Sequence, residues 1–279
     1  MSSYEHQIAK WEGSMVDRED GPPRSAMVTG AARGIGRAIA MRLAAQGYAV
    51  SVADLPSTRS TLDGVVADLA ANGRPALAVT LDVADPESVD AAVAQHVRGF
   101  DGLDVMVANA GIAVTAPLLE TSVDQFRQTM EINVAGVFHC YRAAARQMIS
   151  QGRGGRLIGA ASVAAHRGGK WQGAYSASKF AVRGLSQSVA QELAEYGITV
   201  NVYSPGVVQT PMWHSIDEAV TGRRGTTPGS EMAGMARSIP LGRLETPEDV
   251  AGVVAFLASP DAGYITGRSI VVDGGMWFS

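Results

Sequence analysis

The sequence predicts an α/β protein, a single domain built on a doubly wound parallel sheet with helices on both faces. Short apolar runs alternate with helical patterns along the 279 residues. The apolar runs lack a polar face, which is typical of strands that helices cover on both sides. No break in composition marks a second domain. Alternating strands and helices with right-handed crossovers give a doubly wound sheet.

Seven runs rich in apolar or β-branched residues are expected to form the strands. They are residues 25–29, 49–53, 76–81, 103–108, 156–160, 199–203 and 269–272.

Helices are expected between these strands, and several have clear start signals. Residues 85–86 and 246–247 each place a capping side chain before a proline at the first helical position. Ser122 and Gln125 have the spacing of a capping box. A further helix is expected over residues 37–46.

The domain is expected to span residues 25–279, after an N-terminal extension of residues 1–24. Residues 211–241 are rich in Gly, Arg, Thr and Met, and we expect an irregular loop there. A loop of that length is usually functional, so we interpret it as a substrate lid, with a disordered insertion as the alternative. Met212, Trp213 and Ile216 would line its inner side.

Charge and composition exclude several classes of function. A net charge of −4 gives no general attraction to nucleic acid or to a membrane surface. The sequence has no apolar run long enough to cross a membrane, and residues 1–24 lack the apolar core of a secretory signal. Cys140 is the only cysteine, so no intrachain disulfide can form. We expect a cytoplasmic protein in which Cys140 is a buried, inert thiol.

A glycine-rich turn follows the first expected strand. Gly30, Gly34 and Gly36 are spaced Gly-x-x-x-Gly-x-Gly, with Arg33 and Ile35 between them. Glycines let the backbone turn tightly and approach a pyrophosphate, and the helix that follows offers free N–H groups and positive potential. We therefore expect this turn to bind the phosphates of a dinucleotide. The alternative is a purely steric role for the glycines.

The residues that end the second and third strands predict which dinucleotide binds. Asp54 can accept both ribose hydroxyls of an adenosine and would repel a 2′-phosphate. Arg33 could pair with such a phosphate, but Asp54 holds the discriminating position, so NAD is favoured over NADP. Asp82 is expected beside the adenine with Val83 next to it, although Asp82 could instead cap the following turn.

Tyr175 and Lys179 are four residues apart and share one helix face. A free tyrosine is a poor base at neutral pH, and an ammonium group alongside lowers its pKa. The pair could give a proton to a carbonyl oxygen as hydride reaches the carbon, or take it back in oxidation. Ser162 could orient the substrate oxygen at the carboxyl edge of the sheet. Asn133 could hold a water that relays the proton, or bond to helix backbone.

These motifs together resemble the short-chain dehydrogenase/reductase family, from about residue 25 to residue 275. The shared motifs are Thr29-Gly30-x-x-x-Gly34-x-Gly36, Asn109-Ala110-Gly111, Asn133, Ser162, Tyr175-x-x-x-Lys179 and Pro205-Gly206. The resemblance implies a Rossmann-type fold and a nicotinamide-dependent oxidoreductase. It also implies a catalytic tetrad of Asn133, Ser162, Tyr175 and Lys179.

The resemblance implies further contacts with the cofactor. Asn109 and Gly111 would support the sheet beside the adenosine ribose, and Lys179 would also hold the nicotinamide ribose. The carboxamide end of the nicotinamide would lie against the residues that follow the sixth strand, which are Pro205, Gly206, Val208 and Thr210.

Within the family, residues 52–56, 174–194 and 274–276 look most like acetoin/diacetyl reductases and 2,3-butanediol dehydrogenases. A sugar or polyol dehydrogenase and a 3-oxoacyl thioester reductase stay open, because residues 166–172 are polar for a small-diketone pocket. A binding protein that senses NAD is the alternative outside enzymes. The family resemblance also implies a homotetramer. No metal is expected, since the five histidines lack ligand spacing.

Overall fold

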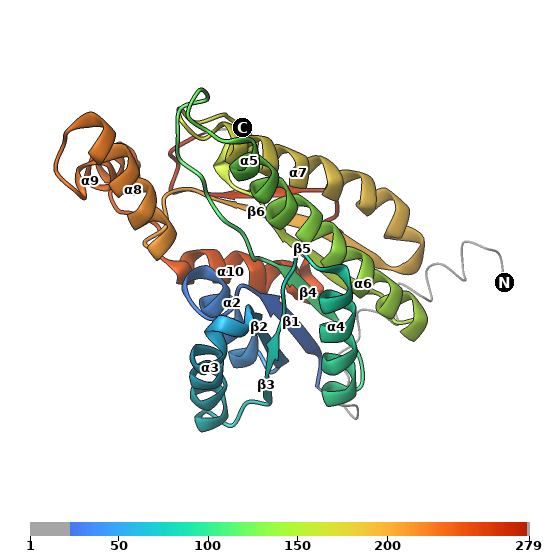
Figure 1. Cartoon of the computed structure of the whole chain (residues 1–279). Coiled ribbons are helices and arrows are strands. Elements are labelled where there is room, and N and C mark those ends of the chain that lie inside the picture. Colours follow the sequence, from blue (N-terminus) through green and yellow to red (C-terminus); the bar gives the residue numbers. More distant parts are fainter. Residues whose placement is uncertain (1–22, 278–279) are drawn as a thin grey trace.

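Seven parallel strands form one sheet in residues 23–277, the part of the chain that the computed structural model describes (Figure 1). The strands are β1 (Ser25–Thr29), β2 (Ala49–Asp54), β3 (Ala76–Thr80), β4 (Val105–Ala108), β5 (Gly155–Ala160), β6 (Ile198–Pro205) and β7 (Ser269–Val272). All seven predicted strands are confirmed, with ends shifted by two residues at most. The extension predicted for residues 1–24 lies outside the described residues, apart from its last two.

Helices connect the strands. They are α2 (Gly34–Ala45), α3 (Arg59–Ala71), α4 (Pro86–Phe100), α5 (Val123–Met130), α6 (Gly136–Gln151), α7 (Gly173–Leu193), α8 (Pro211–Arg224), α9 (Ser230–Ser238) and α10 (Pro247–Ala258). The predicted start signals are confirmed. Asp85 accepts the N–H of Glu87 at the start of α4, and capping boxes begin α5 at Ser122 and α10 at Thr246.

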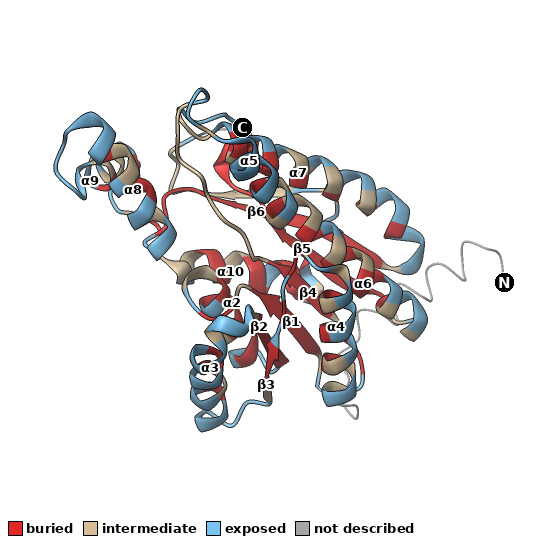
Figure 2. Cartoon of the chain, in the orientation of Figure 1, coloured by how far each residue is buried: buried red, intermediate tan, exposed pale blue. Residues whose placement is uncertain are grey.

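Two apolar layers enclose the sheet (Figure 2). Successive side chains of a strand point to opposite faces, so Val28 packs with α2, α3 and α10, whereas Met27 packs with α4, α6 and α7. Both residues are fully buried. This double covering explains why the strands have no polar face in the sequence.

The order of the strands positions the site. Across the sheet the order is β3-β2-β1-β4-β5-β6-β7, and every neighbouring pair is parallel. The winding therefore reverses between β1 and β4. In open α/β sheets ligands bind at the carboxyl ends of the strands beside such a reversal.

The prediction of irregular backbone over residues 211–241 was wrong, because most of this segment forms α8 and α9 (Figure 1). A buried carboxylate holds the two helices together: Asp217 in α8 accepts the N–H groups of Gly229 and Met232. Gly225 ends α8 in the left-handed conformation that favours glycine. Of the glycines in this segment, Gly225 and Gly229 mark the turn between the two helices, whereas Gly222 and Gly234 lie within α8 and α9.

Cys140 is buried in α6, and burial raises the pKa of its thiol to about 12. The predicted inert thiol is therefore confirmed. Within residues 23–277 we find no helix that combines the length and apolarity needed to cross a membrane.

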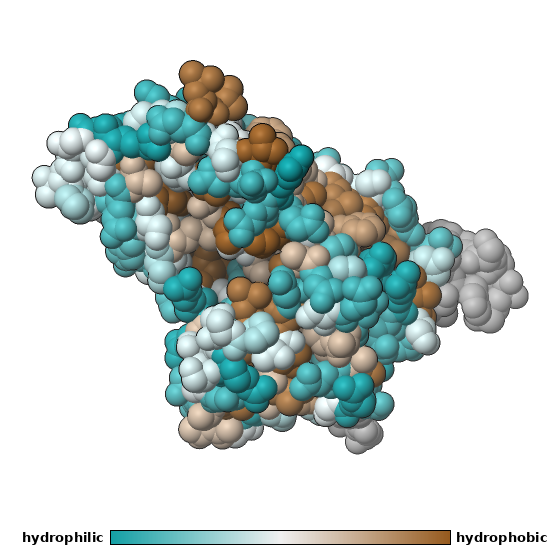
Figure 3. All heavy atoms as spheres, viewed as in Figure 1, coloured by the Kyte–Doolittle hydropathy of each residue, from teal (hydrophilic) through white to brown (hydrophobic). Residues whose placement is uncertain are grey.

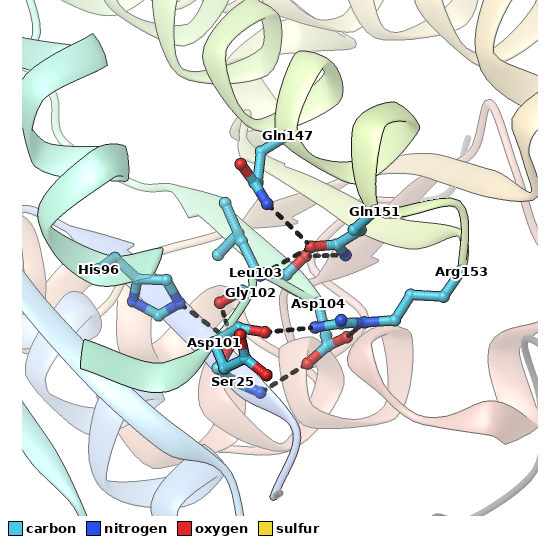
Figure 4. Close-up of polar contacts among 9 residues, drawn as sticks. All are labelled: Ser25, His96, Asp101, Gly102, Leu103, Asp104, Gln147, Gln151 and Arg153. Carbon is cyan, nitrogen blue, oxygen red and sulfur yellow. Dashed lines mark hydrogen bonds and ion pairs between the residues drawn. The ribbon is translucent and has the colours of Figure 1, made fainter. Parts of the chain in front are cut away.

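A buried histidine joins the first two strands to α4 at the amino edge of the sheet. His96 is fully buried, and its ring nitrogens contact the hydroxyls of Ser51 at 2.7 Å and Ser25 at 3.1 Å. The Ser25 hydroxyl donates to the carbonyl of Gly102, so it accepts from His96 Nε2. Asp104, paired with Arg153, accepts the backbone N–H of Ser25 beside it (Figure 4).

Acid is expected to destabilise the protein through this histidine. Burial lowers the pKa of His96 to about 4 from an ordinary 6.5, so between these values the unfolded chain binds a proton that the folded chain does not. Stability should fall as the pH falls from about 6.5 to about 4, by up to about 3 kcal/mol. Urea unfolding of wild type and His96→Asn at pH 7 and pH 4.5 measures this effect. The exposed His214→Asn serves as the control, and an equal acid loss in all three proteins would contradict the assignment.

Candidate active site

The loop between β1 and α2 brings two backbone segments unusually close. A side-chain Cβ on Gly36 would lie 2.2 Å from the carbonyl oxygen of Gly30 and 2.6 Å from Nδ2 of Asn109. Gly30 itself has a φ of 64°, which favours glycine. Only glycine at position 36 therefore lets α2 start directly against the end of β1.

The N-terminus of α2 is open to an anion. Arg33 is its N-cap residue and is exposed, and no side chain within residues 23–277 caps the helix. Its first turn holds no acidic residue. Free N–H groups and the helix dipole favour a phosphate at such an end. The open helix end and the glycine cradle fit the pyrophosphate of a dinucleotide.

Asn109 ties the phosphate loop to the centre of the sheet. Its Nδ2 donates to the carbonyls of Thr29 and Gly30, at 2.8 and 3.2 Å, and its Oδ1 accepts the hydroxyl of Tyr203 in β6 at 2.7 Å. The hydroxyl of Thr29 accepts the N–H groups of Asn109 and Ala110 in return, both at 3.0 Å. The ends of β1, β4 and β6 are thereby locked together.

The residues predicted to select the cofactor follow β2 and β3. Asp54 is half-buried, and its Oδ2 accepts the N–H of Ala32 in the phosphate loop at 3.0 Å. Asp82 is exposed, and its side chain accepts the N–H of Ala84 at 3.0 Å. It therefore caps the turn after β3, which was the alternative role predicted for it. Val83 is buried against Gly136, where an added Cβ would lie 2.8 Å from its side chain.

Asn133 lies in a π-helix, Glu131–Ala135, inserted between α5 and α6. Its side chain is fully buried and bonds twice to the backbone of Ile112, through Oδ1 and Nδ2, both at 2.9 Å. Nδ2 also donates to the hydroxyl of Ser178, which donates in turn to the carbonyl of Tyr175. Such single-turn π segments often mark functional sites. Here the backbone partner is the loop after β4, and not the helix backbone that was one of the two predicted alternatives.

Lys179 is buried near this asparagine. Its Nζ donates to the carbonyl of Ala160, at the end of β5, at 2.8 Å. A Cβ on Gly111 would lie 3.6 Å from the same Nζ and 3.1 Å from Oδ1 of Asn133, so the three residues are neighbours. Burial lowers the pKa of Lys179 to about 8, because the charged form is disfavoured away from water.

Tyr175 completes the group. A side-chain hydrogen bond joins it to Ser162, and the Nζ of Lys179 lies 5.5 Å from the centre of its ring. Burial raises the pKa of Tyr175, and the hydrogen bond with Ser162 opposes this only in part. For the protein alone the pKa is thus raised, and the lowering expected from Lys179 together with an oxidised nicotinamide ring stays a prediction. The four residues of the predicted tetrad nevertheless lie together.

The turn after β6 lies against the phosphate loop. Thr210 begins α8 by accepting the N–H of Trp213, and its methyl group would lie 3.6 Å from a Cβ on Gly34. Val208 is buried and pairs with Glu245 in an isolated β-bridge. The residues predicted for the two ends of a dinucleotide therefore share one edge of the sheet.

The surface is hollowed between the α8–α9 segment, which is the predicted lid, and the rest of the molecule, and apolar side chains lie in the hollow (Figure 3). Trp213 packs against the core and Ile216 is buried, so of the three predicted lid residues only Met212 is exposed. In the polar loop of residues 166–172, Arg167 and Lys170 are both exposed.

Sequence reasoning missed four residues that support this site: Thr29 as a hydrogen-bonding group, Ser178, Tyr203 and Glu245. Ser178 stands inside the Tyr-x-x-x-Lys motif, and Tyr203 carries a polar atom in an apolar strand. These two features of the sequence could have identified Ser178 and Tyr203 as supporting residues. Nothing local marks Glu245, because its burial depends on the tertiary fold.

Replacing Gly36 with alanine is expected to distort the phosphate loop. The added methyl group would overlap the Gly30 carbonyl, and overpacking of this kind costs about 1–3 kcal/mol. The free energy of unfolding, measured in urea, and the affinity for NADH should both decrease. Gly64→Ala is the matched control, because its Cβ meets open space on α3 and should add up to about 1 kcal/mol of stability. Normal NADH binding by Gly36→Ala would contradict the cradle.

The chain is similar to known proteins over most of its length. The family described as Enoyl-(Acyl carrier protein) reductase matches residues 30–277. The L-2,3-butanediol dehydrogenase of Corynebacterium glutamicum is 45% identical over 254 residues, covering 91% of this chain and 98% of that protein. The galactitol 2-dehydrogenase of Agrobacterium fabrum is 39% identical over 254 residues, covering 91% and 97%.

A solved structure extends the likeness to three dimensions. Acetoin dehydrogenase YohF from Salmonella typhimurium matches with a TM-score of 0.79 at 35% identity, covering 91% of this chain and 96% of that one. Sequence and fold are therefore alike over nearly the whole described chain. The protein belongs to the short-chain dehydrogenase/reductase family and is an oxidoreductase acting between alcohols and ketones.

Proposed function

We propose that this enzyme uses NAD(H) to interconvert a secondary alcohol and a ketone of the acetoin, diacetyl and 2,3-butanediol type, with Tyr175 as general acid and base. The observation that carries the proposal is the grouping of Tyr175, Ser162 and Lys179 beside a loop that fits a dinucleotide pyrophosphate. The substrate type is supported by the relatives named butanediol dehydrogenase and acetoin dehydrogenase.

The side chains supply the proton chemistry. A bound nicotinamide donates or accepts the hydride. Because burial raises the pKa of Tyr175, its hydroxyl keeps the proton at neutral pH and can give it to a carbonyl oxygen during reduction. Ser162 orients that oxygen through its own hydroxyl. In oxidation the phenolate must form, and the nearby ammonium group of Lys179 stabilises it.

The preference for NAD follows from Asp54. Its carboxylate stands at the end of β2, fixed by the N–H of Ala32, where it would accept ribose hydroxyls and repel a 2′-phosphate. Arg33 is exposed and could oppose this selection. Asp54 should outweigh Arg33, because its carboxylate stands at the discriminating position and would repel a 2′-phosphate there.

The remaining assignments complete the proposal. Asp82 and Val83 would contact the adenine, and Asn109 and Gly111 would support the adenosine ribose. The carboxamide of the nicotinamide would be held by the turn formed by Pro205, Gly206, Val208 and Thr210. A homotetramer in the cytoplasm is the expected state of the enzyme. Light scattering that shows a stable monomer at micromolar concentration would contradict the oligomer.

A polyol dehydrogenase is the second candidate. The relative named galactitol 2-dehydrogenase supports it. The charged residues Arg167 and Lys170 are exposed, so the polar loop of residues 166–172 does not require a hydroxyl-rich substrate. A 3-oxoacyl thioester reductase is less favoured, because such reductases normally use NADPH and Asp54 opposes its phosphate. An NAD-sensing protein without turnover would have no use for the intact tetrad.

A substrate panel tests the proposal. NADH and NADPH are each assayed at 340 nm with diacetyl, acetoin, a keto-sugar and an acetoacetyl thioester. We expect the fastest oxidation with NADH and diacetyl or acetoin. Asp54→Asn should bring the rates with NADH and NADPH closer together, since the substitution removes the charge that would repel the 2′-phosphate of NADPH. Turnover only with NADPH, or only on the sugar or thioester, would refute the proposed substrate and cofactor.

Tyr175→Phe is expected to lower kcat by at least about a hundredfold, because general acid–base catalysis contributes about 10²–10⁴. NADH binding, measured by fluorescence, should remain. Tyr264→Phe is the matched control, since Tyr264 is 98% exposed and its hydroxyl lies in solvent. A Tyr175→Phe enzyme as active as this control would disprove the mechanism.

A further inference from the structure

Glu245 is a buried carboxyl that the residue assignments above leave without a role. It is 7% exposed and stands just before the N-cap of α10. Its backbone pairs with the turn after β6: its N–H donates to the carbonyl of Val207 at 3.0 Å, and its carbonyl accepts the N–H of Gln209 at 2.9 Å. Residue 245 is thus bound by main chain to the segment proposed to hold the nicotinamide.

The side chain reaches the same turn. Its Oε2 accepts the N–H of Gly206 at 2.9 Å, and this N–H also donates to the carbonyl of Val272 in β7 at 2.9 Å. A Cβ on Gly206 would lie 2.9 Å from Asp273 and 3.6 Å from the same Oε2, so the carboxyl packs directly against the glycine. Its Oε1 is buried and has no hydrogen-bond partner within residues 23–277.

The charges around Glu245 do not favour a carboxylate. Asp249 in α10 and Asp273 after β7 both face it and raise its pKa, as burial does more strongly, to about 8. Arg243 opposes them, but its guanidinium is held by both oxygens of Asp249, at 2.6 and 2.8 Å. A buried carboxyl with one shared donor and no cation of its own is best accommodated in the neutral form.

We propose that Glu245 is a positioning residue whose neutral carboxyl holds the turn of residues 205–210 in the shape that receives the nicotinamide end of the cofactor. The inference rests on the proposed function, which assigns that turn to NAD(H). An ionised Glu245 would need water at its unpaired oxygen, and the turn would have to open to admit it. Cofactor affinity should therefore decrease when this carboxyl loses its proton.

NADH titrations followed by fluorescence test the proposal. Between pH 7 and about pH 9.5 the wild type should lose about tenfold in NADH affinity beyond the loss seen in Glu245→Gln, which has the same shape and cannot ionise. Glu248→Gln is the matched control, because Glu248 is an exposed carboxylate on the same helix. It should behave as the wild type. Comparing variants also removes the contribution of Lys179, which is common to all three proteins.

Thermal unfolding provides a second readout that does not depend on the cofactor. The folded protein keeps the Glu245 proton above the ordinary pKa of 4.5, whereas the unfolded chain has released it. Stability should therefore fall as the pH rises from about 4.5 through about 8. Glu245→Gln escapes this loss and should melt above the wild type at pH 9.

The outcomes separate this inference from the proposed function. A wild type that binds no NADH at any pH would refute the proposed function, and with it the role of the turn. Normal NADH binding with the same pH dependence in wild type and Glu245→Gln would refute the role of Glu245 alone. Equal pH dependence of melting in these two proteins would refute the neutral buried carboxyl.

Discussion

The side chain of Asn109 is the contact on which the rest of the site depends. It joins the ends of β1, β4 and β6 through the Thr29 and Gly30 carbonyls and the hydroxyl of Tyr203. The loop that leaves β4 from this point carries Ile112, whose backbone fixes Asn133. The phosphate loop and the proton-transfer group are therefore each hydrogen-bonded to the same short loop after β4.

Burial sets the electrostatics of this edge of the sheet. Tyr175, Lys179 and Glu245 all have pKa values shifted toward their neutral forms, and desolvation is the largest cause in each case. Forming a charge on any of these groups therefore costs more free energy in the buried site than it would in water. A charged ligand bound here would shift the pKa values of these three groups strongly, because charges interact more strongly in a buried site than in water.

Features with local causes could be predicted from the sequence. The strands follow from apolar runs, the starts of α4, α5 and α10 from their caps, and the cradle from glycine spacing. Features with distant causes could not. Residues 211–238 form two packed helices, held together because Asp217 reaches Gly229 and Met232 across a turn. The pKa of Tyr175 rises because tertiary packing buries it, and the same packing hides the carboxyl of Glu245.

The π-helix at Glu131–Ala135 has a consequence for the length of the chain. The hydrogen bonds of a π-helix run from residue i to residue i+5, so such a turn takes up one residue more than an α-helical turn. The loss of one residue from this segment would therefore restore a continuous α-helix, and Val137 and Tyr141 would stay buried. The deletion would instead remove the bulge that holds Asn133 against the backbone of Ile112.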